Sequence, residues 1–223
     1  MSKNVKDVYD EDLQPEPRWH AVIAFLAVGG LWAALPRELI VGPRWLFLVI
    51  VIVLLIPTYL THEKKYYRMN RVLGFIISGV VTVGMIISVI LLIKSLPEKM
   101  ETAAELLTSA AVLWITNILV FALWYWRLDA GGPHHREKRL GHPDGSFLFP
   151  QMTLPQETKE DTGQDEWSPN FVDYLFIAFN TSTAFSPTDA PVLDRWAKVL
   201  MMVQSIISLT VLALLAARAV NIF

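Results

Sequence analysis

The chain contains no cysteine and carries little charge, since only 18% of its 223 residues are Asp, Glu, Lys or Arg. Without thiols, disulfide bridges, thiolate metal sites and cysteine catalysis are all excluded. Soluble domains usually contain about 25% charged residues. This chain has instead 53% hydrophobic residues and a mean hydropathy of +0.41. The composition therefore excludes a soluble enzyme, a DNA-binding module and a disordered tail as the main body.

Long runs without a charged residue are the main feature that is present. A run of roughly twenty such residues is typical of a membrane-spanning helix. We expect five runs to cross the membrane, namely residues 19–35, 45–60, 72–93, 106–126 and 196–220, of which only the last holds charged residues, Lys198 and Arg218 near its ends. The first two are the shortest, and Pro36 and Gly42-Pro43 between them favour a tight hairpin. The glycines at 74, 79 and 84 favour close helix packing in lipid.

Polar residues divide the chain into three parts. Residues 1–18 form a polar N-terminal lead-in that has none of the order of a signal peptide. Residues 19–105 form a three-helix transmembrane region, and residues 106–223 form a module that contains one long hydrophilic loop, 129–170. This loop shows no helical periodicity, and its acidic run from Glu157 to Glu166 is typical of a solvated segment.

The stretch 171–189 combines a short apolar run with a polar end. Residues 171–179 are apolar and aromatic apart from Asp173, and they are too few to cross a bilayer. Small and hydroxylated residues follow, up to Pro187 and Asp189. Irregular backbone at membrane depth survives only where protein buries it or water lines it. We therefore predict a re-entrant short helix followed by a polar loop, and overall an all-α integral membrane protein with about five transmembrane helices.

The order of helix, short helix, Thr-rich loop ending in Asp and long helix resembles the pore module of tetrameric potassium-type channels. That family's loop reads Thr-Thr-Val-Gly-Tyr-Gly-Asp, and residues 182–189 here read Ser-Thr-Ala-Phe-Ser-Pro-Thr-Asp. The flank is also similar, with Pro191, Ala197-Lys198 and an end at Ala216-Ala217-Arg218, so the resemblance covers roughly residues 106–222. It implies a homotetramer with its pore on the symmetry axis. It also implies an ion pathway along Thr181, Ser182, Thr183, Ala184, Phe185, Ser186, Pro187, Thr188 and Asp189.

The loop departs from the family where the two glycines stand. Those glycines allow the backbone angles that aim carbonyls at the ion, whereas Phe185 and Pro187 disfavour them. We therefore expect a filter lined by the hydroxyls of Ser182, Thr183 and Thr188, with a ring of Asp189 carboxylates at its mouth. Carboxylate rings favour cations. The sequence predicts a passive cation channel that needs no cofactor and conducts a monovalent cation, without the repeated arginines of a voltage sensor.

Each of these residues also has a structural interpretation. Asp189 fits a turn, and Thr181 to Thr183 fit the satisfaction of backbone groups at a helix end. In the last span the small or polar residues either line the pore or pack against other helices: Gln204, Ser205, Ser208 and Ala216. Thr116-Asn117 would anchor its span to the short helix or to the last span. The second hypothesis is therefore a non-conducting structural or regulatory membrane protein descended from a pore module.

Enzyme activity is the third and weakest hypothesis. Apart from His20, the first four spans hold no Asp, Glu, Lys, Arg or His between their ends, which argues against an ion-coupled transporter or an intramembrane enzyme. His134, His135 and His142 lack the spacing of a metal site, so we expect no metal. A lipid-headgroup enzyme built on residues 134–144 would need these histidines and an acid within about 3 Å of each other in an interfacial cleft.

The charge distribution predicts the orientation. With a cytoplasmic N-terminus, 14 of the 19 Lys and Arg residues lie on the cytoplasmic side and 5 on the other. The re-entrant loop would then enter from the cytoplasm, whereas potassium-type channels present it from outside. An external N-terminus, an early run that does not cross, or an inverted loop would each resolve this. We expect a bacterial-type inner membrane location, and as partners other copies of the chain and membrane lipid but no nucleic acid.

Overall fold

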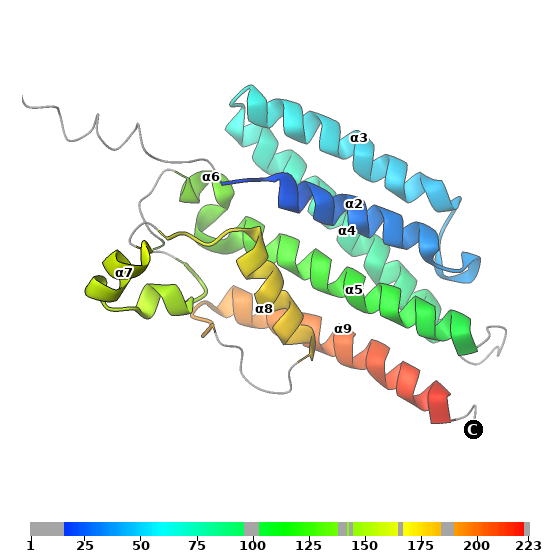
Figure 1. The fold of residues 1–223 in the computed structure, drawn as a ribbon. Helices are drawn as coiled ribbons and strands as arrows, with labels where there is room; N and C mark the ends of the chain where they lie inside the picture. Colours follow the sequence, from blue (N-terminus) through cyan, green and yellow to red (C-terminus); the bar gives the residue numbers. More distant parts are fainter. Residues whose placement is uncertain are drawn as a thin grey trace, which may run out of the picture.

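The computed structural model of the protein describes residues 16–95, 103–137, 142, 145–164, 167–183 and 190–220. Over these residues the regular structure is helical and contains no strand, with one isolated β-bridge between Phe147 and Val192. The predicted all-α membrane architecture is confirmed. Five long helices form a bundle (Figure 1): α2 (Trp19–Ala34), α3 (Arg44–Glu63), α4 (Tyr67–Ser95), α5 (Ala103–Leu128) and α9 (Arg195–Val220).

Four of the five predicted spans are helices long and apolar enough to cross a membrane, namely α3, α4, α5 and α9. The first, α2, is apolar but has only 16 residues. At 1.5 Å per residue it measures about 24 Å, somewhat less than the ~30 Å of a hydrocarbon core. It ends before Leu35-Pro36, and a 3₁₀ turn η1 (Arg37–Leu39) leads to α3, which forms the predicted hairpin with α2. Pro57 lies inside α3, six residues before the helix ends at Glu63.

Helix α5 is the central element of the bundle. It packs against α2 and α4 on one side and against α8 (Phe171–Thr183) and α9 on the other. Figure 1 shows this arrangement, with α2, α3 and α4 on one side of α5 and with α8 and α9 on the other. The indole N–H of Trp124 on α5 donates to the Thr82 hydroxyl on α4 (2.8 Å). The Ser88 hydroxyl on α4 donates to the Leu39 carbonyl (2.7 Å). Helix α5 therefore contacts the helices on both sides of the bundle.

The glycines of α4 have three different surroundings. A methyl group at Gly84 would come within 2.6 Å of the Phe47 ring on α3, so the prediction of close packing is confirmed there. At Gly74 it would come within 1.6 Å of the Arg127 guanidinium, so that position admits a side chain of α5. Nothing lies within 4 Å of such a group at Gly79. The contacts at the first two are made by side chains rather than by the facing backbone.

Helix α8 begins and ends without crossing the bundle. Its first residue, Phe171, lies edge-on to Trp126 near the end of α5, with ring centroids 6.1 Å apart. The last turn of α8 lies beside Gln204, which is nine residues and about 14 Å from the start of α9. The chain is back at the starting end by Pro191, whose carbonyl accepts from the Leu148 N–H (2.9 Å). The segment therefore has the re-entrant geometry predicted from its short apolar run.

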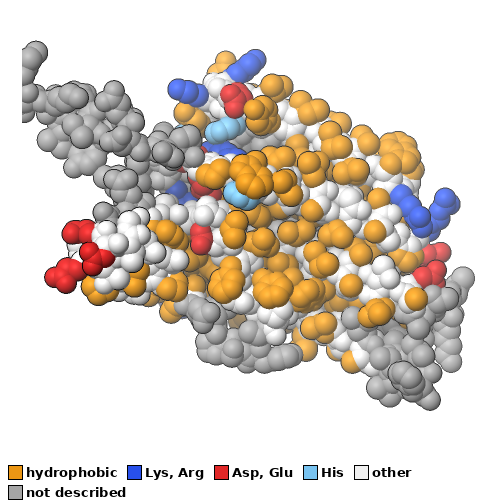
Figure 2. Space-filling model, viewed as in Figure 1, with side chains coloured by type: hydrophobic (Ala, Val, Ile, Leu, Met, Phe, Trp, Pro, Cys, Tyr) orange, Lys and Arg blue, Asp and Glu red, His pale blue; other side chains and the backbone are white. Residues whose placement is uncertain are grey.

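The hydrophilic stretch contains short helices that its lack of periodicity did not predict. These are η3 (Asp129–Gly131), α6 (Pro133–Arg136), η4 (Pro150–Thr153) and α7 (Gln156–Thr162). They are too short to show an amphipathic repeat, because one or two turns cannot define a period. Together with Arg18, the α3–α4 turn and the starts of α8 and α9, they form what we call the loop end of the bundle. Figure 2 shows hydrophobic side chains over the middle of the molecule and charged ones toward both ends.

Candidate functional site

A hydrogen-bonded group centred on Gln204 joins α5, α8 and α9 at the middle of the bundle. Gln204 is fully buried. Its amide nitrogen donates to the Ala178 carbonyl (2.6 Å) and to the Ser182 hydroxyl (2.8 Å). Its amide oxygen accepts from the Tyr125 hydroxyl (2.5 Å). All three long-range bonds are made by a neutral side chain, which is how a polar group is accommodated in an apolar interior.

Three more side chains extend this group. The Ser208 hydroxyl donates to the Ser182 carbonyl (2.9 Å), and the Ser205 hydroxyl to the Thr181 carbonyl (3.3 Å). The Asn117 amide donates to the backbone oxygen of Gln204 (3.1 Å), which confirms that Asn117 anchors its span to the last one. The carbonyls at the end of α8, which have no partner within the helix, are thus bound by α9.

The structure places the predicted ion-pathway and inner-helix residues in different surroundings. Thr181 and Ser182 are buried within the chain, whereas Thr183 is exposed and its hydroxyl donates to the Phe179 carbonyl (3.0 Å). Ser208 is buried and Ser205 half-buried, while Ala216 is exposed, so these three do not share one environment. The remaining loop residues lie outside the described part of the chain: Ala184, Phe185, Ser186, Pro187, Thr188 and Asp189.

A second polar group, the Asp129 cluster, lies at the loop end. Asp129 is fully buried just after α5, and one carboxylate oxygen contacts both the Tyr174 hydroxyl and the His142 Nε2 at 2.7 Å. The other oxygen accepts from the Ser146 N–H (2.5 Å). The Ser146 hydroxyl in turn donates to Asp194 (2.6 Å) just before α9. One carboxylate therefore ties α5 to α8, to His142 and to Ser146.

Arg136 and Glu16 close this end of α5. Arg136 is buried, and its guanidinium donates to the carbonyls of Trp126 (2.8 Å) and Asp129 (3.0 Å) and to the Glu16 carboxylate (2.9 Å). Glu16 also accepts from the Trp126 ring N–H. Burial raises the pKa of Glu16 above its ordinary value, although Arg136 opposes this shift. The cation caps the C-terminal carbonyls of the helix, which is favourable at its negative end.

The turn that positions Arg136 depends on Gly132. Its φ of +93° lies in a region that side chains rarely adopt, and a Cβ there would come within 2.7 Å of the Arg127 carbonyl. Pro133 follows at the first position of α6, where its missing N–H has no consequence. The sequence Gly131-Gly132-Pro133 therefore folds the chain back over the end of α5.

The three histidines of the loop do not come together. His134 and His135 line one pocket with ring centroids 6.3 Å apart, and His134 also stacks on Tyr67 at 3.5 Å. His142 instead belongs to the Asp129 cluster. Among the described residues, no three His, Asp or Glu side chains are grouped as metal ligands would be. His142 does lie within 3 Å of an acid, but both side chains are buried. The cleft that the enzyme hypothesis requires is therefore not formed around this pair.

Sequence analysis missed the Asp129 cluster. Its members stand at positions 129, 142, 146, 174 and 194, in segments that share no period or motif. The only sequence signal was the Gly131-Gly132-Pro133 turn, which predicts a reversal but not what the reversal covers.

Comparison of the chain with protein-family models, with curated proteins and with solved structures gives no match.

Proposed function

We propose that this integral membrane protein is a passive cation channel of pore-loop architecture, in which α8 is the pore-type helix and α9 the inner helix. One observation supports it above the others: the chain enters the bundle with α8, reaches the level of Gln204 in the middle of α9, and returns to the same end by Pro191. A segment with this course delivers polar backbone to mid-depth without crossing, which is what a pore loop requires.

The direction of α8 suits a cation. Its C-terminal end, the negative end of the helix dipole, lies at mid-depth beside the middle of α9. At this end Thr183 is exposed in the single chain and Asn180 is half-buried. A cation at that depth loses most of its hydration, so the dipole and the Thr183 hydroxyl would offset part of the cost.

We further propose that four copies assemble around a common axis, conduct a monovalent cation and reside in a bacterial-type inner membrane. Among the uncovered apolar faces of the described residues are one on α8, with Val172, Phe176 and Phe179, and one on α9, with Met202 and Ile206. Such faces suit either lipid or neighbouring copies. A lining of hydroxyls and carboxylates is the proposed alternative to the glycine filter.

A second candidate function is a non-conducting structural or regulatory role. Ser182, Gln204 and Ser208 bond to each other within one chain and are nearly without exposure. Side chains used in this way hold helices together and are not free to bind an ion. This observation favours a membrane scaffold in which these side chains serve helix packing.

Cation flux into proteoliposomes containing the purified full chain tests the proposal. We expect a tetramer in mild detergent, and flux that falls at least about tenfold in Thr183→Val, because each copy loses a hydroxyl worth about 1 kcal/mol or more. Adding Asp189→Asn should abolish the remaining flux. Thr108→Val is the matched control, since Thr108 is also exposed and also bonds to its own helix (2.8 Å), near the start of α5.

The outcomes separate the two candidates. Flux that survives Thr108→Val and is lost in Thr183→Val supports conduction through this end of α8. A stable oligomer with no flux supports the scaffold role. A monomer that remains monomeric in lipid nanodiscs rejects the pore, because one re-entrant segment cannot enclose a pathway.

A further inference from the structure

A basic pocket lies at the loop end, between the start of α4 and the end of α5. It has a volume of about 340 Å³, and the residues that line it include four arginines: Arg18, Arg68, Arg71 and Arg127. None of the described lining residues is acidic. The volume falls within the usual size of ligand sites. Guanidinium groups that share one volume repel each other, so this pocket is suited to an anion.

Arg127 is the most informative member of the pocket. Its side chain is nine-tenths buried, with an exposed fraction of 8%. It lies against Gly74 of α4 and stacks on the Trp126 ring at 5.4 Å, but it makes no hydrogen bond or ion pair with any residue that the structure describes. A buried charge is costly unless it is paired. The cavity that Arg127 lines offers the space for the missing partner.

The other three arginines differ in whether a described acidic residue pairs with them. Arg18 donates to Glu137 (2.9 Å) and to the Asn70 side chain (3.4 Å), so its charge is matched within the chain. Arg68 and Arg71 are exposed at the start of α4, and Arg71 lies over the Phe75 ring at 5.8 Å. Neither has an acidic partner among the described residues. Three cations of the pocket therefore have no counter-charge within the part of the chain that the structure describes.

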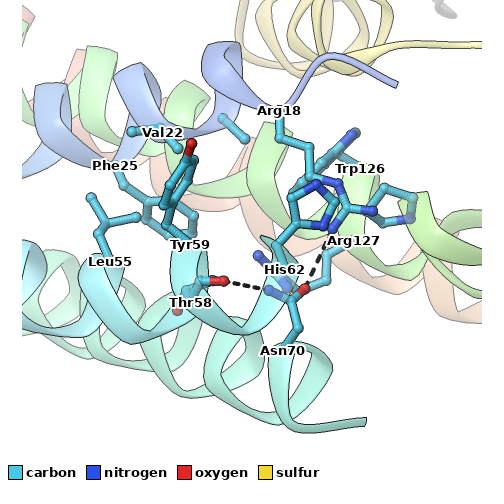
Figure 3. Close-up of a pocket in the computed structure, with 12 residues that line it drawn as sticks. Arg18, Val22, Phe25, Leu55, Thr58, Tyr59, His62, Asn70, Trp126 and Arg127 are labelled. Atoms are coloured by element: carbon cyan, nitrogen blue, oxygen red, sulfur yellow. Dashed lines mark hydrogen bonds between the residues drawn. The ribbon is translucent and has the colours of Figure 1, made fainter. Parts of the chain in front are cut away.

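An apolar groove opens from this pocket. A second cavity of about 60 Å³ shares Arg18, Asn70, Arg127 and Pro133 with the basic pocket and continues between α2 and α3. Its far wall is lined by Val22, Phe25, Leu55 and Tyr59. Figure 3 shows this division, with Arg18, His62, Asn70 and Arg127 grouped on one side and the apolar side chains on the other.

We propose that the pocket and groove together bind an anionic phospholipid. The phosphate lies among Arg68, Arg71 and Arg127, and the first part of an acyl chain follows the groove between α2 and α3 toward the bilayer interior. Charge complementarity selects the headgroup, and the adjoining apolar wall selects an amphiphile rather than a small anion. Basic pockets between transmembrane helices at a membrane surface bind anionic headgroups in this way. This inference does not depend on conduction.

Native mass spectrometry of the delipidated full chain in mild detergent tests the proposal, with phosphatidylglycerol, phosphatidylcholine of the same acyl chains, and inorganic phosphate as separate probes. We expect phosphatidylglycerol to bind more tightly than phosphatidylcholine. Arg68→Gln/Arg71→Gln should weaken phosphatidylglycerol about 25-fold, at roughly fivefold for each arginine near the membrane surface. Lys64→Gln/Lys65→Gln is the matched control, because it removes two exposed cations of the neighbouring turn that do not line the pocket.

A third variant separates lipid from free phosphate. Val22→Phe fills the groove and leaves the arginines in place, so it should weaken phosphatidylglycerol and leave phosphate unchanged. If phosphate displaces phosphatidylglycerol and Val22→Phe has no effect, the ligand is a free anion and the lipid assignment is wrong. Equal binding of the two phospholipids, or equal loss in the arginine and lysine variants, also overturns the proposal. The exposed arginine pair keeps the test independent of any folding defect in Val22→Phe.

Discussion

Arg127 and Asp129 stand two residues apart at the end of α5, and both are buried charged residues, yet their surroundings are opposite. Asp129 contacts Tyr174, His142 and Ser146 on the side of α8. Arg127 faces α2 and α4 and has no polar partner among the described residues. Burial alone therefore does not define the role of a charge in this protein. A charge with its partners in the chain stabilises the fold, and a charge that lacks them is available to a ligand.

Among the changes that test this comparison, removing the carboxylate of Asp129 should have the largest effect on the free energy of unfolding. Asp129→Ala leaves the Tyr174 hydroxyl, the His142 ring and the Ser146 N–H buried without their acceptor. We expect the free energy of unfolding to fall by about 3–5 kcal/mol, which is roughly 10 °C in Tm. Thermal unfolding followed by tryptophan fluorescence in mild detergent measures it. Asp161→Ala, at an exposed site of α7, should change Tm by less than about 2 °C, and equal losses would contradict a structural role for the cluster.

Replacing each of two buried arginines by methionine should change stability in opposite directions. Arg136→Met removes the cation that bonds two carbonyls and Glu16, and should lower the free energy of unfolding by about 3 kcal/mol. Arg127→Met removes a buried cation that no described residue bonds, and should raise the free energy of unfolding by about 1 kcal/mol in a zwitterionic detergent. The same unfolding assay measures both. Added phosphatidylglycerol should raise Tm in the unmodified chain and not in Arg127→Met. Equal destabilisation by both substitutions would show that Arg127 is held by the fold.

The pH dependence of Glu16 should give the smallest effect. Its pKa is raised by burial, so the folded state binds more protons than the unfolded state between the ordinary value and the raised one. Stability contributed by this group is therefore greatest at the acidic side and falls as the pH rises through the raised pKa. Relative to Glu16→Gln, we expect the Tm of the unmodified chain to fall by the order of 2 °C over that range. Glu157→Gln, an exposed carboxylate of α7, should leave the pH profile unchanged, and an identical effect of both would refute the assignment.

Most of the helical framework could be predicted from the sequence. Charge-free runs located α3, α4, α5 and α9, with ends that differ from the observed ones by up to five residues. The short run 171–179 predicted the start of α8 and its failure to cross, because length alone limits what can span a bilayer. The helix continues to Thr183, through hydroxylated residues that were expected in the polar loop. Asn117 and Gln204 were recognised as polar groups that need partners in an apolar interior, and they are bonded to each other's helix.

The two polar groups at the loop end could not be predicted. Arg18, Arg68, Arg71 and Arg127 stand at three helix ends, and each one by itself fits an ordinary cation at a membrane surface. His142 had no spacing relation to Asp129 or Tyr174. Antiparallel spans bring alternate helix ends to the same surface, but the rotation of each helix decides which side chains meet there. That rotation follows from side-chain packing between helices, which a single sequence does not display.

The sequence by itself determined that this chain is an all-α membrane protein with one segment that turns back, because hydrocarbon accepts only helices of sufficient length and requires every backbone polar group to be satisfied. Only the tertiary structure decided that Asp129 is enclosed by donors while Arg127 opens onto a pocket. The physical reason is that a charge is stabilised by groups within a few ångströms of it, and in this protein those groups come from distant positions in the chain.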